Sequence, residues 1–325
     1  MRNKAVLALC LSVVSYSSFA IDIFRKGFEA NFAAAVLYSD SNAISLGFQN
    51  FDPNQIANIG DDFGNQASLD LKKDLGVTTL PYTFELPTIT FEDNSVLEQR
   101  VKVLFSYLRQ KQNVNFNNEP VSDTLKEQIY TLAAHYSVTR PWTDYWSIGA
   151  GIGTNVMYLE NDFTYRTQFS EQTRDIVEGN IFNTSAWAQT FQPNLNLHYK
   201  HPQSWGRWEA FSDLNYFYGY GGGQGNDGDI GNPEGLYWIN GIKGFYDITH
   251  WGGYGQTLFS SVRHININGD LKESLNTHEY WEASIGWLVS PPFLRDYVDN
   301  IGIGINLNYG SSLSGGTIIL LFNQD

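Results

Sequence analysis

The sequence predicts an all-β fold: a twelve-stranded antiparallel transmembrane β-barrel with an N-terminal helix inside its lumen. The first observation is strict alternation over residues 300–310. Ile301, Ile303 and Ile305 fall on one face of a strand, and the other face carries only Gly and Asn. The second is that such alternation recurs along the whole chain. The third is an N-terminal export signal. This combination is typical of β-barrels in the outer membrane of Gram-negative bacteria.

The first twenty residues have the features of a cleavable signal peptide. Arg2 and Lys4 precede a short apolar run over residues 5–14, and Ser18-Phe19-Ala20 offers small residues for cleavage before Ile21. The run is shorter than the roughly 20 apolar residues that a membrane-spanning helix needs. No later stretch is as long, which excludes a helical membrane protein.

The single cysteine, Cys10, lies within the predicted signal peptide. Leu9 precedes it where a lipoprotein would have a small residue, so we do not expect a lipid anchor. The mature chain then has no thiol, which excludes disulfides, cysteine-ligated metals and a cysteine nucleophile.

The chain is acidic, with 20 basic and 34 acidic residues, and loss of Arg2 and Lys4 leaves 18 basic residues. This balance argues against nucleic acid as a partner, since such binding depends on neutralising phosphates. It suits surface loops at which divalent cations bridge to lipopolysaccharide. The mean hydropathy of −0.29 is compatible with a barrel, because only every second strand residue faces lipid.

Twelve segments have the composition and alternation of strands. They are residues 43–51, 78–91, 97–110, 128–139, 145–160, 185–200, 207–220, 236–248, 254–265, 278–289, 300–309 and 314–322. In residues 128–139, for example, Tyr130, Leu132 and Tyr136 are expected to face lipid, whereas Thr131 and His135 face the lumen.

Long and short connections alternate between these segments. Residues 52–77, 111–127, 161–184, 221–235 and 266–277 are long and polar, whereas 92–96, 140–144, 201–206 and 249–253 are short. Short periplasmic turns that alternate with longer extracellular loops are typical of such barrels. An even number of strands places both ends of the barrel in the periplasm.

Residues 22–38 differ from the rest, because Phe24, Phe28, Phe32 and Val36 recur every four positions, as on one face of a helix. The alternative is a hairpin of residues 29–38 with 43–51, which would add a thirteenth strand. We favour the helix. The predicted organisation is therefore a signal peptide at 1–20, a helix that plugs the lumen at 21–42, and the barrel at 43–325.

Three motifs are candidates for functional sites, but none is predicted to be catalytic, cofactor-binding or metal-binding. His135-Tyr136-Ser137 is similar to the His-x-Ser of the outer-membrane phospholipase, but Val138-Thr139 follows where that enzyme has Asn-Gly, and both side chains should face the lumen. The glycine-rich residues 223–228 precede no helix, so a dinucleotide site is not expected. Asp227, Asp229 and Glu234 could ligate calcium, but a solvated loop is the favoured interpretation.

The predicted lumen carries charges of both signs, such as Arg100, Arg207 and Arg263 against Glu98, Glu209 and Glu282. A pore that selects one sign of solute would show mainly one sign of charge. The mixture indicates an interior of paired charges or contacts to the plug.

A helix followed by twelve strands resembles the translocator domain of autotransporters, in which a helix threads the barrel. Because no large segment lies between the predicted signal and the barrel, the chain resembles the solitary, passenger-less autotransporter barrels. The resemblance implies outer-membrane lipid, lipopolysaccharide and the barrel-assembly machinery as partners, and it carries no catalytic residues. We expect that the protein is not an enzyme, that it binds no cofactor and that it has a structural or surface-interaction role. The alternative is a narrow diffusion pore for small solutes or oligosaccharides.

Overall fold

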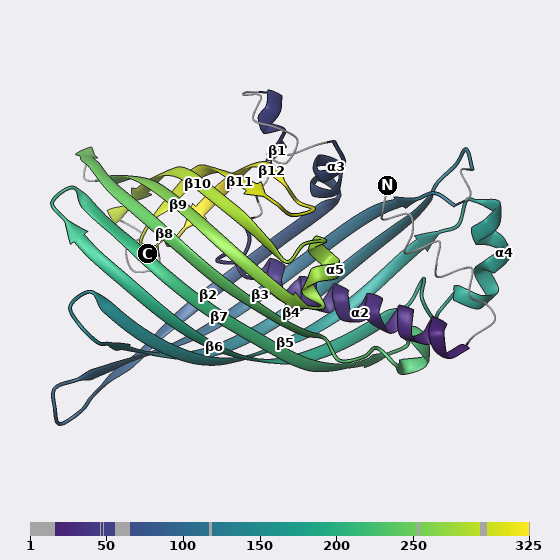
Figure 1. Cartoon of the computed structure of the whole chain (residues 1–325), viewed down its shortest axis with the longest axis horizontal. Coiled ribbons are helices and arrows are strands. Elements are labelled where there is room, and N and C mark those ends of the chain that lie inside the picture. Colours follow the sequence, from purple (N-terminus) through teal and green to yellow (C-terminus); the bar gives the residue numbers. More distant parts are fainter. Residues whose placement is uncertain are drawn as a thin grey trace.

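The chain folds into one curved antiparallel sheet of twelve strands that surrounds an N-terminal helix (Figure 1). The computed structural model describes residues 17–45, 47, 49–55, 66–116, 119–251, 254–292 and 298–324. The strands are β1 (Gln49–Phe51), β2 (Leu75–Thr90), β3 (Val96–Val114), β4 (Asp123–Pro141), β5 (Trp146–Thr164), β6 (Ser185–Gln203), β7 (Gly206–Gly223), β8 (Glu234–Trp251), β9 (Tyr254–Gly269), β10 (Glu279–Ser290), β11 (Ile301–Tyr309) and β12 (Gly315–Phe322). From β2 to β12 each strand pairs antiparallel with the next strand in the chain, and β12 also pairs with β1, which confirms the predicted twelve-stranded antiparallel sheet.

The two faces of the sheet differ as the alternation predicts. On β4, Leu132 is 58% exposed on the outer face, whereas the adjacent Thr131 and Ala133 are each 2% exposed on the inner face. The apolar outer side chains of the other strands follow the same rule, as at Ile303 and Ile305 on β11. An apolar outer face is the surface that a barrel presents to lipid. In the described residues, no helix is long and apolar enough to cross a membrane.

Helix α2 (Ser17–Ser39) lies inside the curved sheet, which confirms the predicted lumenal helix and excludes the hairpin alternative. It contacts β2 to β5 on one side and β8 on the other. The predicted signal peptide, residues 1–20, lies outside the described residues apart from Ser17–Ala20, which begin α2. Its cleavage stays a prediction.

Helix α2 enters from the end of the barrel that carries the long loops, which we call the long-loop end. Its N-terminal half lies against two elements of those loops, η3 (Gly225–Gly228) and α5 (Leu271–Leu275). Since long loops are extracellular in outer-membrane barrels, the start of α2 is on the outer side. The C-terminal end of the barrel lies at the short turns, whereas α2 begins at the opposite end, among the long loops.

The first strand is much shorter than predicted. Residues 43–51 are predicted to form it, but among the described residues of this range only Gln49–Phe51 pair with β12. Ala43 and Ile44 are instead buried inside the barrel, because the chain reverses after α2 and reaches the wall partway along β12. At Gly47 a Cβ atom would collide with the backbone oxygen of Ile318, so only glycine permits this close approach.

A helix lies where the two ends of the sheet meet. The hydrogen-bonded order runs from β1 through β12 to β2, and no pairing joins β1 to β2 in the residues described. Helix α3 (Gln66–Asp74) contacts β1, β2 and β3 at this place, which we call the seam. Lys72 of α3 donates to the Gly315 carbonyl (3.1 Å) and to Thr317 Oγ1 (3.0 Å) of β12.

The long loops carry an ordered layer above the barrel. Helix α4 (Gln168–Val177) packs through Phe169 and Val177 onto a small apolar cluster that includes Phe116, Phe163 and Phe182. Its N-terminal amides are capped by carboxylates, as Glu119 accepts from Gln168 N at 2.8 Å. The loops are therefore held to one another as well as to the strands.

The plugged lumen as the candidate functional site

The central feature of the molecule is the apolar contact between α2 and the inner wall. Phe32 and Leu37 of α2 have no exposed surface, and they belong to one buried cluster with Tyr237 and Ile239 of β8 and Ile265 of β9. Full burial of a side chain of this size contributes about 1.5–3 kcal/mol. A helix with several such residues is therefore a stable part of the folded barrel.

Hydrogen bonds fix the middle of α2 to three different parts of the molecule. Asn31 donates to Glu127 of β4 at 2.8 Å, and the carbonyl of Ala30 accepts from Ser274 of α5 at 2.9 Å. Glu29 accepts from the amide of Asn232 at 2.8 Å. These contacts set the depth of the helix in the lumen.

The turn after α2 is bound to the wall through its backbone and one carboxylate. Asp40 accepts from the Tyr237 hydroxyl at 3.0 Å, and the Ala43 carbonyl accepts from the Tyr280 hydroxyl at 2.8 Å. Arg263 of β9 donates to the carbonyls of Ser41 (2.9 Å) and Asn42 (2.8 Å). The reversal of the chain is therefore held on both sides.

Arg263 also forms a buried ion pair with Glu282 of β10, and their side chains are 8% and 0% exposed. The Glu282 carboxylate accepts in addition from the amide of Ser45 (3.1 Å) and from Asn308 Nδ2 (3.2 Å). A buried carboxylate needs such partners because the loss of water is costly. The pair links the turn to three strands of the wall.

A second polar network crosses the wall beneath α2. Asn155 of β5 donates to Gln192 of β6 at 3.0 Å, and Gln192 donates to the Tyr237 hydroxyl at 2.8 Å. Tyr237 in turn donates to Asp40. This chain of hydrogen bonds connects β5, β6 and β8 to the end of the helix, which fixes the turn relative to the barrel.

These features of a meander barrel entered by an N-terminal helix agree with the sequence comparison. The family model of the solitary outer membrane autotransporter beta-barrel domain matches residues 29–324. The chain belongs to this family. The solitary autotransporter barrels are outer-membrane proteins, so this barrel is located in the outer membrane. No curated protein matches the sequence.

Toward the short turns, the inner wall of this solitary autotransporter barrel is polar, and its charges are paired. Arg207 donates to Glu209 at 2.7 Å, and His198 lies 2.9 Å from Asp213. Arg100 lies 3.5 Å from Glu98. The predicted interior of mixed and paired charge is thereby confirmed for these residues, and Arg263 with Glu282 supplies the predicted contact to the plug.

The small residues of β5 do not make room for the aromatic side chains of α2. Gly149, Gly151 and Gly153 lie on the inner face of this strand, where they alternate with outward residues such as Ile148 and Ile152. Side chains of neighbouring strands fill this space instead, since a Cβ atom would meet Asn196 at Gly149, Asn194 at Gly151 and His135 at Gly153. Phe28 lies against Gly225 of η3. Strand alternation gives the face of a residue, but not its height relative to the helix.

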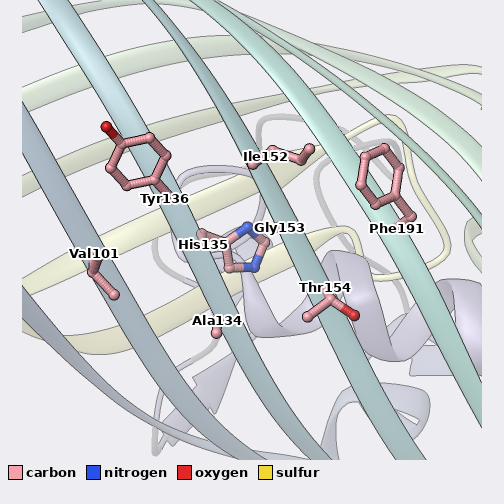
Figure 2. Close-up of a pocket in the computed structure, with 8 residues that line it drawn as sticks. All are labelled: Val101, Ala134, His135, Tyr136, Ile152, Gly153, Thr154 and Phe191. Carbon is pink, nitrogen blue, oxygen red and sulfur yellow. The ribbon is translucent and has the colours of Figure 1, made fainter.

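His135 and Ser137 face inward, as predicted, because Tyr136 between them is 39% exposed on the outer face. Figure 2 shows the ring of His135 beside Gly153 at a shallow depression of about 310 Å³. Its rim consists of outer-face residues such as Val101, Ile152 and Phe191. In the described residues no hydrogen bond joins His135 to Ser137.

The acidic residues of the β7–β8 loop do not converge on one point. Asp229 lies 3.8 Å from Arg25, and Glu234 accepts from Tyr216 at 2.9 Å. Across the described parts of the chain, no three His, Cys, Asp or Glu side chains are grouped so that they could hold a metal ion. The glycine-rich residues form the short turn η3 before β8.

Proposed function

We propose that this barrel is closed by its own N-terminal helix and has a structural or surface-interaction role, not that of an enzyme. The observation that carries the proposal is the burial of α2 in the lumen. Phe32, Ala33 and Leu37 have no exposed surface, and buried polar contacts hold the helix and the following turn. In this proposal the ordered long loops form the surface that meets partners.

A narrow diffusion pore is the second candidate, and the polar inner wall near the short turns favours it. His198, Lys200 and Arg100 have side chains that are 48%, 59% and 45% exposed. If α2 leaves the lumen, this lining would meet a solute. The two candidates differ in whether the intact protein conducts ions.

Conductance of the purified protein in planar bilayers distinguishes them. We expect the intact barrel to remain closed and a variant that lacks residues 22–38 to open a stable channel, because a single helix about 10 Å across occupies most of such a lumen. Equal conductance of the two proteins would refute the plug and favour the diffusion pore.

A point variant tests the same proposal if the deletion variant does not fold. Ala33→Arg introduces a large charged side chain at a position with no exposed surface, so α2 can no longer pack inside the lumen. The residues of the barrel wall are unchanged in this variant. Its control is Lys26→Ala on the exposed side of the same helix. We expect Ala33→Arg to conduct and Lys26→Ala to stay closed.

A further inference from the structure

The outer face of β3 and β4 carries a group of cations near the long loops. Arg109 and Lys111 of β3 and Lys126 of β4 are exposed, and they share their face with the outward Phe105 and Tyr130. We call these three residues the basic patch. They stand out in a chain that has 34 acidic and 20 basic residues.

The strand register brings the three cations close together. Lys111 pairs directly with Lys126 across the two strands, and Arg109 pairs with Gln128. Like charges directly opposite each other destabilise a sheet. Lys126 lies 3.8 Å from Asp162, but Arg109 and Lys111 form no ion pair within the described residues. Arg109 and Lys111 therefore carry positive charge that no ion pair of the described protein neutralises.

Aromatic side chains show where this patch lies relative to the membrane. Tyr107 pairs with Tyr130, and their ring centres are 5.1 Å apart on the outer face. Exposed Tyr158, Trp187 and Tyr220 continue this belt over β5 to β7. Tyrosine and tryptophan mark the level of the lipid headgroups. Arg109 follows Tyr107 by two residues, about 7 Å farther along the strand in the direction away from the apolar core.

The outer face near the long loops is acidic in other sectors. On the described parts of β8 and β10, outward positions there carry Glu234 and Glu279, and an anionic headgroup would be repelled from them. On β5, Glu160 and Asp162 border the basic patch opposite Gln128 and Lys126, so the positive charge is greatest at Arg109 and Lys111. The basic patch is thus the sector of this face suited to an anion, and the guanidinium of Arg109 can bind phosphate through two parallel hydrogen bonds.

We propose that Arg109, Lys111 and Lys126 form a binding site for the phosphate groups of an outer-leaflet glycolipid such as lipopolysaccharide. The occupant is a lipid because the site lies on the outer wall directly above the aromatic belt, so a bound headgroup would keep its acyl chains along the apolar face of β3 and β4. The proposal is independent of whether the lumen conducts.

The test measures binding of fluorescent lipopolysaccharide to the purified full-length barrel in neutral detergent, with the triple variant Arg109→Gln, Lys111→Gln and Lys126→Gln. Each cation near an anionic lipid surface is worth about fivefold in affinity, so we expect the triple variant to bind roughly tenfold to a hundredfold more weakly. The control is Arg140→Gln, which removes an outward cation at the opposite, short-turn end. This control should bind as tightly as the parent.

Two further arms identify the ligand. Lipopolysaccharide whose phosphates have been removed should bind the parent as weakly as the intact probe binds the triple variant, and inorganic phosphate should not compete. The proposal would be overturned if the parent and the triple variant bound intact lipopolysaccharide equally tightly. It would also be overturned if the parent bound the intact and the phosphate-free probe equally tightly. Competition by inorganic phosphate would overturn the assignment of the site to a lipid. If the triple variant does not fold, Lys111→Gln alone should lose about fivefold in affinity.

Discussion

Lys72 has an unusual environment for a lysine, because it lies buried at the seam with 4% of its surface exposed. Its ammonium group donates to the Gly315 carbonyl and to Thr317 on β12, while its backbone carbonyl accepts from Asn50 of β1 at 3.2 Å. One side chain thus joins α3 to the end of the sheet. Burial lowers the pKa of Lys72 from 10.5 to about 8, and the nearby Glu282 opposes this shift.

The lowered pKa of Lys72 predicts a pH-dependent stability. Between pH 8 and 10.5 the unfolded chain binds more protons at this residue than the folded protein does, so the free energy of unfolding should rise with pH. The full effect is about 3 kcal/mol at most. It can be measured by urea unfolding in detergent micelles at several pH values, for the parent protein and Lys72→Met.

Other groups titrate in the same range, so the comparison with Lys72→Met isolates the contribution of this lysine. The stability of the parent should improve relative to that of the variant as the pH rises from 8 to 10.5. A constant difference across this window would mean that Lys72 has the same pKa in both states.

At the scale of elements, the reversal of the chain after α2 determines how the sheet ends. Because the turn binds the inner wall, β1 begins partway along β12 and has only three residues. Strand β2 is consequently an edge strand over most of its described length. It contains Pro81 and Pro87, and proline is tolerated in a sheet mainly at edges and bulges. The register also shifts between Leu86 and Ile89, as expected of a bulge.

The buried pair of Arg263 and Glu282 should control the stability of this turn. Arg263→Ala leaves the Glu282 carboxylate buried without its cation and removes two donors to the turn, so we expect a loss of about 3–5 kcal/mol in the free energy of unfolding. Replacement of both residues, Arg263→Met with Glu282→Leu, should cost less because no charge remains buried. Urea titration followed by tryptophan fluorescence measures both. A double variant less stable than Arg263→Ala would contradict this account.

At the scale of the whole molecule, the barrel has two different halves. Near the long loops α2 fills the lumen, and ordered loops with α4 and α5 lie above it. Near the short turns the inner wall of β6 and β7 is polar and solvent-exposed, whereas Phe245, Phe259 and Leu288 form an apolar cluster on the other side. The extracellular half is thus suited to closing the lumen and to contacts with partners, whereas the inner wall of the periplasmic half is suited to contact with solvent.

A continuous sheet from β1 to β12 predicts strong resistance to detergent. The mature protein should fractionate with the outer membrane and migrate faster on gels when it is not heated, because paired strands keep the backbone hydrogen bonds satisfied in lipid. Membrane fractionation and electrophoresis of heated and unheated samples test this. A soluble protein whose mobility does not change on heating would contradict the barrel.

Local periodicity predicted the strands and the faces of the wall, since an apolar outer face and a polar inner face alternate with a period of two. It also predicted α2, whose aromatic residues repeat with helical spacing. The edge position of β2 was not predicted, although Pro81 and Pro87 are a local signal compatible with it. Local sequence could not show the short loop helices as clearly, since their few turns give little periodicity.

The sequence by itself therefore determined the membrane-spanning sheet, its order and the existence of the lumenal helix, because these depend on neighbouring residues and on the satisfaction of backbone hydrogen bonds in lipid. Only the tertiary structure decided the depth and direction of α2, the three-residue β1, the seam at α3 and the partners of Arg263 and Lys72. Those features depend on contacts between residues more than 200 positions apart, such as Ser45 with Glu282. No local pattern encodes such contacts.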